Sequence, residues 1–421
     1  MTLIMRGRLR YAAVSAAAIL GAWASGRGAA AEPAPPYRDL LAQAQSSAPR
    51  LAEAEAGVRQ AQGLARQAAA RPNPTAAVEM ENFSGTGPYR GTGVAETTFS
   101  VGLPVELGGK RGARIAAGRA GVDAARARLA QARADYAFEL AAAYAEAEAA
   151  ERRVTLAQES LTLAEEDLRA ARALVEAGKE AELRSLQAQA GVTSARAALD
   201  AARTARASAF ARLTALAGSP ALFTSLAESL LPRPTPANLE RTIEALSVPA
   251  VVAAQAEREA AARRVRVERT RAIPDVTVSA GVRRFSGDDS RAVVAGVSVP
   301  FPVFDQNRGN VNAAQGELLA AEARLNAARL DAEAELRTAL FQVEAAGTRV
   351  AAAVETEATA AEAYRLTRIA YESGKSPLVE LTNARRALAE ARTQTIEAQL
   401  QRLRAEAGLA RLQGRAPFGV S

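Results

Sequence analysis

The sequence predicts a mostly α-helical fold with a small β part: a long-helix coiled-coil unit, duplicated in tandem, with one β-hairpin in each copy. Three observations support this fold class. Aromatic residues make up only 4% of the 421 residues and alanine is the commonest residue, a composition typical of long, closely packed helices. Long proline-free stretches carry apolar residues at heptad spacing. The same landmark residues recur in both halves of the chain.

The composition excludes most catalytic chemistry. The chain contains no His and no Cys. A Ser-His-Asp triad, a Cys nucleophile, a disulfide framework and the usual zinc sites are therefore excluded. Gly108–Lys110 is not a phosphate-binding loop, because Arg111 stands where that motif needs Ser or Thr. We expect no enzyme, no cofactor and no resident metal.

Residues 1–31 have the pattern of a secretory signal peptide. Arg6, Arg8 and Arg10 precede a mostly apolar stretch, and Ala29–Ala31 provides an A-x-A cleavage site. The pattern predicts Sec export; the alternative is an uncleaved membrane anchor, although the apolar stretch is short for a span. Lipidation at a cysteine is not expected, because the chain has none. This segment contributes much of the +7 net charge, so the charge gives little support for a nucleic-acid partner.

The rest of the chain reads as two copies of one unit, about 32–231 and 232–421. Landmarks recur at a nearly constant separation: Ser47–Pro49 with Ser247–Pro249, Asn73–Pro74 with Ile273–Pro274, Arg111–Gly112 with Arg308–Gly309, and Glu176–Lys179 with Glu372–Lys375. The proline-rich residues 232–236 form the predicted joint. A unit this long, present only twice, indicates duplication rather than a solenoid.

Each unit contains a predicted β-hairpin, at about 75–104 in the first and about 275–300 in the second. Along each run apolar residues alternate with polar ones, so that each hairpin has one aliphatic face and one polar face. Prolines bound the hairpins at both ends.

Helices fill the remainder of each unit. A helix over 37–71 precedes the first hairpin, a very long helix over 111–178 follows it, and a shorter one over 182–217 runs back. The second unit repeats this arrangement over 238–271, 308–374 and 377–413. Two short helices stacked end to end match one long helix, which spans roughly 100 Å at about 1.5 Å per residue. The pattern predicts a cylinder of long helices beside paired short ones.

The hairpins indicate an oligomer if they enter a membrane. Their strands have the length and alternation that an outer-membrane barrel needs, whereas the alternative is a soluble hairpin packed on the helices. Four strands cannot close a barrel, and an open edge cannot exist in lipid. Since bacterial barrels have roughly eight strands or more, several chains must pool their hairpins, and three chains give twelve strands.

Four stretches of sequence resemble a known family: Arg71–Thr75, Glu79–Phe83, Glu96–Thr98 and Pro104–Arg111, the last reading Pro-Val-Glu-Leu-Gly-Gly-Lys-Arg. They are similar to the TolC-like outer-membrane factors, within them the heavy-metal branch typified by CzcC. The resemblance implies a trimeric twelve-stranded barrel in the outer membrane of a Gram-negative bacterium, continued by a helical tunnel in the periplasm. The implied function is the exit duct of a tripartite efflux pump. Its implied partners are a periplasmic adaptor (membrane fusion protein) and an inner-membrane transporter of the proton-driven RND type.

The resemblance also implies where the functional residues lie. The turns between long and short helices match the family's periplasmic tip, the expected adaptor contact: Gly178, Lys179 and Leu183 in the first unit, Gly374, Lys375 and Val379 in the second. Glu380 occupies the place of an acidic pore-constricting residue, and Arg184 is its equivalent in the first unit. The alternative for the tip is a plain helix turn with a solvated lysine.

Glu79 and Glu81 fall on the polar face of the first hairpin, where they would line a barrel lumen and favour cations. The alternative is an ordinary solvated strand edge. Two other function classes stay open: a periplasmic coiled-coil adaptor, which needs a β-rich lipoyl-like domain, and a soluble coiled-coil scaffold, which leaves both hairpins unexplained. With no His or Cys and three Met, the chain offers no soft-metal relay, so the residues alone do not identify the cargo.

Overall fold

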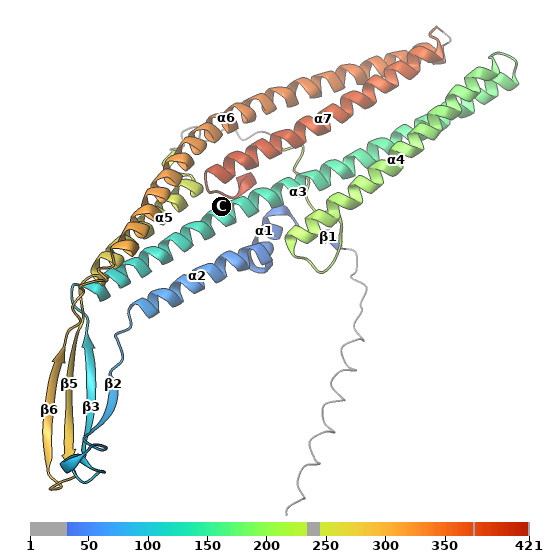
Figure 1. The fold of residues 1–421 in the computed structure, drawn as a ribbon. Helices are drawn as coiled ribbons and strands as arrows, with labels where there is room; N and C mark the ends of the chain where they lie inside the picture. Colours follow the sequence, from blue (N-terminus) through green and yellow to red (C-terminus); the bar gives the residue numbers. More distant parts are fainter. Residues whose placement is uncertain (1–31, 234–244, 374, 420–421) are drawn as a thin grey trace, which may run out of the picture.

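Two long helices run the whole length of the helical part of an elongated molecule (Figure 1). The structure is a computed structural model that describes residues 32–233, 245–373 and 375–419. A four-stranded sheet forms one end, and two helical hairpins end in tight turns at the other. The predicted signal peptide, residues 1–31, lies outside the described residues, as do residues 234–244, which include the second part of the predicted joint at 232–236.

The predicted long helices are confirmed. They are α3 (Lys110–Glu176, 67 residues) and α6 (Arg308–Glu372, 65 residues), and their return helices are α4 (Glu182–Ala217) and α7 (Leu378–Leu412). At about 1.5 Å per residue, α3 spans roughly 100 Å. The heptad stripe of α3 supplies much of its buried face: Val122, Tyr136, Leu140, Ala147, Leu161 and Leu168. Alanines fill the positions around this stripe, so neighbouring helices approach closely.

The short helices differ from the prediction at a proline in each repeat. The expected helix over 37–71 is two helices, because Pro49 begins a new one and Ala48 before it is extended, with ψ 122°. In the second repeat Val248, before Pro249, has ψ 129°, so the expected helix over 238–271 is interrupted there and α-helix runs from Pro249. The resulting elements are α1 (Tyr37–Ser47), α2 (Pro49–Ala68) and α5 (Pro249–Arg271).

The two hairpins form one sheet. Its strands are β2 (Thr75–Glu81), β3 (Glu96–Val105), β5 (Val276–Phe285) and β6 (Arg291–Ser298), all antiparallel in that order. The β3–β5 pair joins the first repeat to the second through ten residue pairs, from Glu96–Phe285 to Val105–Val276. The strands β2 and β6 are therefore the two free edges of the sheet.

The largest hydrophobic core lies midway along the molecule, where the short helices of the first repeat meet. A small parallel sheet that the sequence did not predict lies here, made of β1 (Glu32–Ala34) and β4 (Phe223–Leu226). Tyr37 packs edge-on against Tyr144, with ring centroids 5.9 Å apart, and its hydroxyl donates to the carbonyl of Ala137. This core and its small sheet form a belt that joins both ends of the first repeat to the middle of α3.

A buried carboxylate anchors the chain that leaves the first repeat. Glu148 of α3 is only 4% exposed. It accepts hydrogen bonds from Ser229 Oγ at 2.5 Å, from the backbone N–H of Leu230 at 2.7 Å and from that of Leu231 at 3.1 Å, and it pairs with Arg152 at 3.1 Å. Charge-assisted bonds of this kind are roughly twice as strong as neutral ones.

Replacing Glu148 by Gln is expected to destabilise this belt. Glutamine keeps the size of the side chain but has only one acceptor oxygen, so at least one buried N–H loses its partner, at a cost of about 1–3 kcal/mol. The midpoint of thermal unfolding in detergent measures the loss. Glu151→Gln is the matched control, because the Glu151 side chain is 36% exposed and pairs with Arg206 at 3.1 Å on the surface. Equal midpoints for the two variants would show that Glu148 is not an anchor.

Candidate functional site

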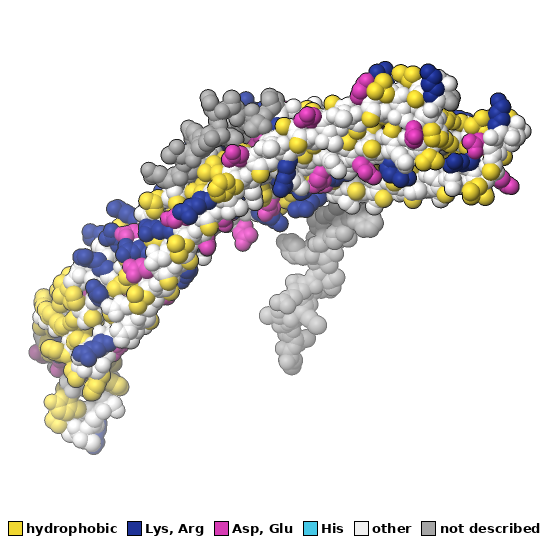
Figure 2. Space-filling view, turned by 90° about the horizontal axis from the view of Figure 1, so that it is seen from above, with side chains coloured by type: hydrophobic (Ala, Val, Ile, Leu, Met, Phe, Trp, Pro, Cys, Tyr) yellow, Lys and Arg dark blue, Asp and Glu magenta, His cyan; other side chains and the backbone are white. Residues whose placement is uncertain are grey.

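One face of the sheet is aliphatic and open. The register aligns Val78, Phe99, Val282 and Val293 in a single row across all four strands. These side chains are between 45% and 83% exposed, and Val101, Leu103, Val278 and Val297 continue the same face. Figure 2 shows hydrophobic side chains gathered over this end of the molecule. In the described structure no helix covers this face, which is an arrangement suited to lipid.

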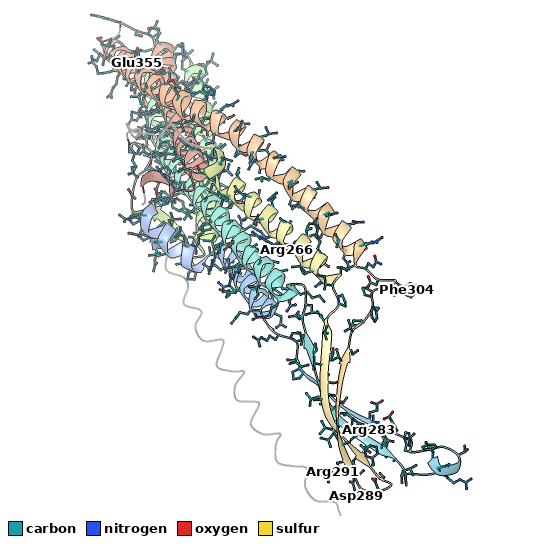
Figure 3. The ribbon with its side chains drawn as sticks, turned by 90° about the vertical axis from the view of Figure 1, so that its left-hand side faces the viewer. Arg266, Arg283, Asp289, Arg291, Phe304 and Glu355 are labelled. Atoms are coloured by element: carbon teal, nitrogen blue, oxygen red, sulfur yellow. The ribbon has the colours of Figure 1, made fainter. Side chains whose placement is uncertain are left out.

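The opposite face is polar and carries an ionic cluster near the strand ends that lie farthest from the helices. Arg283 of β5 pairs with Glu81 of β2 and with Glu96 of β3, each at 2.9 Å, and its Nε donates to Thr98 Oγ1 at 3.0 Å. Figure 3 places Arg283 in this distal part of the sheet, near Arg291 and Asp289. Glu79, the other predicted lumen residue, lies on the same face and has no ion pair within the described residues.

Sequence reasoning placed Glu79 and Glu81 on the polar face but missed Arg283. Alternation along 276–285 already puts residue 283 on that face. What brings it against Glu81 and Glu96 is the pairing of β3 with β5, which is a long-range contact between repeats. The sequence offers one signal: Arg283 is a basic residue on the polar face of a strand that could pair with the strands carrying Glu81 and Glu96.

Bulky apolar side chains also mark the junction between the sheet and α6. Phe301 is 86% exposed and Phe304 is 98% exposed, and Figure 3 shows Phe304 projecting away from the molecule. Aromatic residues at the boundary of an apolar band are typical of membrane interfaces.

The opposite end of the molecule is the pair of helix turns. Gly178 has φ 70°, and Lys179 N–H bonds to Leu174 C=O at 2.9 Å, which closes a Schellman turn after α3. Lys375 N–H bonds to Ala370 C=O in the same way after α6. Leu183 is 61% exposed and Val379 is 46% exposed. Gly374 lies outside the described residues.

The two charged residues proposed for a constriction do not meet within one chain. Arg184, near the start of α4, lies 3.6 Å from Glu180 in the turn that precedes this helix. Glu380 accepts a hydrogen bond from Ser376 at 2.5 Å. Any pairing of Arg184 with Glu380 therefore has to occur between chains.

A ladder of ion pairs instead joins α3 of the first repeat to α7 of the second. Going toward the turns, its members are Asp135–Arg411, Glu146–Arg404, Arg153–Glu397, Glu159–Arg392 and Asp167–Arg385. Asp167–Arg385 is the member nearest to the turns, and both side chains are mostly buried. Burial raises the pKa of Asp167, although Arg385 opposes this shift. Sequence reasoning missed this ladder, because the pairs lie far apart along the chain.

None of the helices in the described ranges combines the length and the apolarity needed to cross a bilayer. Within the same ranges, no three acidic side chains are grouped so that they could hold a metal ion.

The chain has two long-helix hairpins, one in each repeat, and a sheet with one open aliphatic face and one polar face. This combination defines a class of outer-membrane channel subunit. The chain belongs to the outer membrane efflux protein family, whose profile matches residues 40–219 and 244–415. The profile thus matches each half of the chain once, and the family is one of transport components rather than enzymes.

Curated relatives share this family and confirm the resemblance seen in the sequence. The chain is 46% identical over 391 residues to the nickel-cobalt-cadmium resistance protein NccC of Alcaligenes xylosoxydans xylosoxydans, covering 92% of this chain and 88% of that protein. It is 49% identical over 299 residues to the nickel and cobalt resistance protein CnrC of Cupriavidus metallidurans, covering 71% of each. The cobalt-zinc-cadmium resistance protein CzcC of the same organism is 30% identical over 324 residues, 76% of this chain and 77% of that protein.

Solved structures share the fold. A membrane protein from Pseudomonas aeruginosa superposes with a TM-score of 0.77 at 21% identity, covering 90% of each chain. VceC from Vibrio cholerae gives a TM-score of 0.73 at 21% identity, covering 90% of this chain and 96% of that one. The open state of the MtrE outer membrane channel from Neisseria gonorrhoeae gives 0.74 at 21% identity, covering 90% and 89%.

Proposed function

We propose that three copies of this chain form the exit duct of a tripartite efflux pump for heavy-metal cations. The open aliphatic face of the sheet is the observation that carries this proposal. A row of valines and a phenylalanine at 45–83% exposure is costly in water and favourable against lipid tails. The sheet would lie in the outer membrane, and the helices would extend into the periplasm as a tunnel.

Closure of the sheet supports a trimer. The free edges β2 and β6 carry unpaired backbone groups, which are not tolerated in lipid. Pairing β6 of one copy with β2 of the next removes every edge. Three copies with four strands each give a twelve-stranded barrel, within the range of roughly 8 to 26 strands that bacterial barrels show.

The helices also offer a surface for a neighbouring copy. Leu319, Leu330 and Phe341 repeat every eleven residues on α6 and are 66%, 67% and 70% exposed. They lie opposite the buried stripe that includes Leu325 and Leu336, so α6 has apolar residues on two sides. The second stripe would pack against α2 of the next copy, where Leu64 is 63% exposed.

The cargo and the partners follow from the relatives and from the exposed turns. Three curated relatives are named for resistance to nickel, cobalt, cadmium or zinc, which favours divalent metal cations as cargo. The turns carrying Lys179 and Lys375, with Leu183 and Val379 beside them, would meet a periplasmic adaptor. An inner-membrane transporter of the RND type would drive export. Residues 1–31 would direct Sec export and be removed.

Deleting the gene and challenging the cells with metal salts and organic toxicants tests this function. We expect sensitivity to nickel, cobalt, cadmium or zinc to rise and sensitivity to organic toxicants to stay unchanged. Complementation with the parent chain should restore resistance. If the deletion raised sensitivity to organic toxicants and not to metal salts, the cargo would be organic and the proposal of metal export would be wrong.

The oligomeric state has a separate test. Light scattering of the protein purified from outer membranes in mild detergent should give the mass of three chains, because only pooled hairpins remove the strand edges. A monomeric mass with the hairpins still folded would contradict the barrel.

Replacing Glu380 by Arg is expected to raise single-channel conductance. In a ring of three chains Arg184 and Glu380 would alternate, and the variant turns attraction between copies into repulsion. Exposed pairs contribute only about 0–1 kcal/mol each, so the closed state is easily biased. The double variant Glu380→Arg with Arg184→Glu should return toward the parent value, and salt should weaken both effects. Unchanged conductance of Glu380→Arg at low salt would place the constriction elsewhere.

A further inference from the structure

The polar face of the sheet contains a guanidinium that holds two carboxylates at once. Arg283 Nη2 lies 2.9 Å from Glu81 Oε2, its Nη1 lies 2.9 Å from Glu96 Oε2, and its Nε donates to Thr98 Oγ1 at 3.0 Å. The planar fork of arginine suits such an arrangement, whereas the point charge of lysine does not fix two partners. The Arg283 side chain is 30% exposed, so the cluster borders open space rather than protein interior.

This guanidinium is the single basic group on that face. Across 75–81, 96–105, 276–285 and 291–298, all within the described residues, alternation places one arginine and three glutamates on the polar side. The glutamates are Glu79, Glu81 and Glu96, of which the last two contact Arg283. The cluster carries net negative charge, and Arg283 cancels part of it.

Arg283 also connects the two repeats. It lies on β5, whereas its three partners lie on β2 and β3 of the first repeat. In the first repeat the strand equivalent to β5 is β2. It ends at Glu81, so it has no residue at the position that corresponds to Arg283. In the part of the chain that the structure describes, this cluster of Arg283 with Glu81 and Glu96 therefore occurs once, although the strands themselves are duplicated.

We propose that Arg283 sets the ion selectivity of the outer part of the channel. This inference rests on the proposed function, because it requires the polar face to line the lumen. With Arg283 in place, Glu81 and Glu96 are neutralised in part and held against the wall, and Glu79 is left as the free carboxylate. Without Arg283 all three carboxylates would face the passing ions, and a ring of like charges in a narrow lumen concentrates counter-ions.

Reversal potentials of single channels in planar bilayers under a potassium chloride gradient test this inference. Arg283→Gln is expected to shift the reversal potential toward that of potassium, with a few-fold rise in the cation-to-anion permeability ratio at low salt. Glu81→Gln should shift it in the opposite direction. Arg283→Lys, which keeps the charge, should stay near the parent value.

Arg284→Gln is the matched control. Arg284 is the next residue of β5, lies on the opposite face and pairs with Asp289 at 2.7 Å. The Arg284→Gln variant removes the same charge from the chain, but from the face that does not line the lumen. Its reversal potential should therefore equal that of the parent. An equal shift in Arg283→Gln and Arg284→Gln, or no shift in Arg283→Gln, would overturn the inference. Should Arg283→Gln fail to assemble, an unshifted Glu81→Gln channel would overturn it equally. A parent chain that forms no channels would instead refute the proposed function.

Discussion

Phe99→Arg and Val278→Arg are expected to keep the chain out of the outer membrane. Both side chains lie on the aliphatic face, Phe99 in the middle of its strand at 55% exposure and Val278 at 47%. An arginine facing lipid near the bilayer centre costs about 2–4 kcal/mol, and the cost falls on every copy in the assembly. The amount of trimer in the urea-resistant membrane fraction measures the effect.

Neighbouring residues on the polar face provide the controls. Ser100→Arg and Ser279→Arg introduce the same charge one residue further along the same two strands, and alternation directs it away from the aliphatic face. These variants should insert at close to the parent level. Normal insertion of Phe99→Arg together with failure of Ser100→Arg would show that the two faces are assigned the wrong way round.

Reversing the ion pair nearest to the helix turns is expected to open the channel at that end, which we propose to lie in the periplasm. Arg385→Glu places a negative charge against Asp167, and because both sites are mostly buried the repulsion is poorly screened. A change from attraction to repulsion of about 2 kcal/mol per chain alters an equilibrium roughly thirtyfold. Single-channel conductance should rise, and the double variant Arg385→Asp with Asp167→Arg should return it toward the parent value. Parent-like conductance in Arg385→Glu would show that this pair does not hold the end closed.

The same pair predicts a dependence on pH. Burial, and to a lesser degree the neighbouring Glu166, raise the pKa of Asp167, so its carboxylate becomes neutral at a higher pH than an exposed aspartate would. Neutral Asp167 no longer attracts Arg385 as an ion. Conductance of the parent should therefore rise as the pH falls through this pKa. In Asp167→Asn the conductance should already be raised at neutral pH, and this pH response should be absent.

The helices were predictable because they depend on local signals. Gly178 and Pro377 mark the helix ends next to the turns, and the absence of proline between residues 111 and 178 permits one continuous helix. The same rule applies at Pro49 and Pro249, each of which begins a new helix where the prediction has one continuous helix. The small sheet of β1 and β4 could not be predicted, because three or four residues of strand carry no recognisable period and gain their stability from the core around Tyr37.

The site residues divide in the same way. The alternation of polar and apolar residues assigns Glu79, Glu81 and Phe99 to their faces without knowledge of the fold. Arg283 and Asp167 became evident only when their partners were placed beside them. Roles for Arg184 and Glu380 stay predictions, because they depend on contacts between chains.

The sequence by itself determined the duplication, the long helices, the two-faced strands and the family resemblance carried by stretches such as Pro104–Arg111. These features depend on residue order and on periodicities of 3.6 and 2 residues, which are local properties of the chain. Only the tertiary structure decided that β3 pairs with β5, that Arg283 clamps Glu81 and Glu96, and that Asp167 meets Arg385. Such contacts join residues separated by more than a hundred positions, and they are selected by packing and register between elements rather than by any local preference.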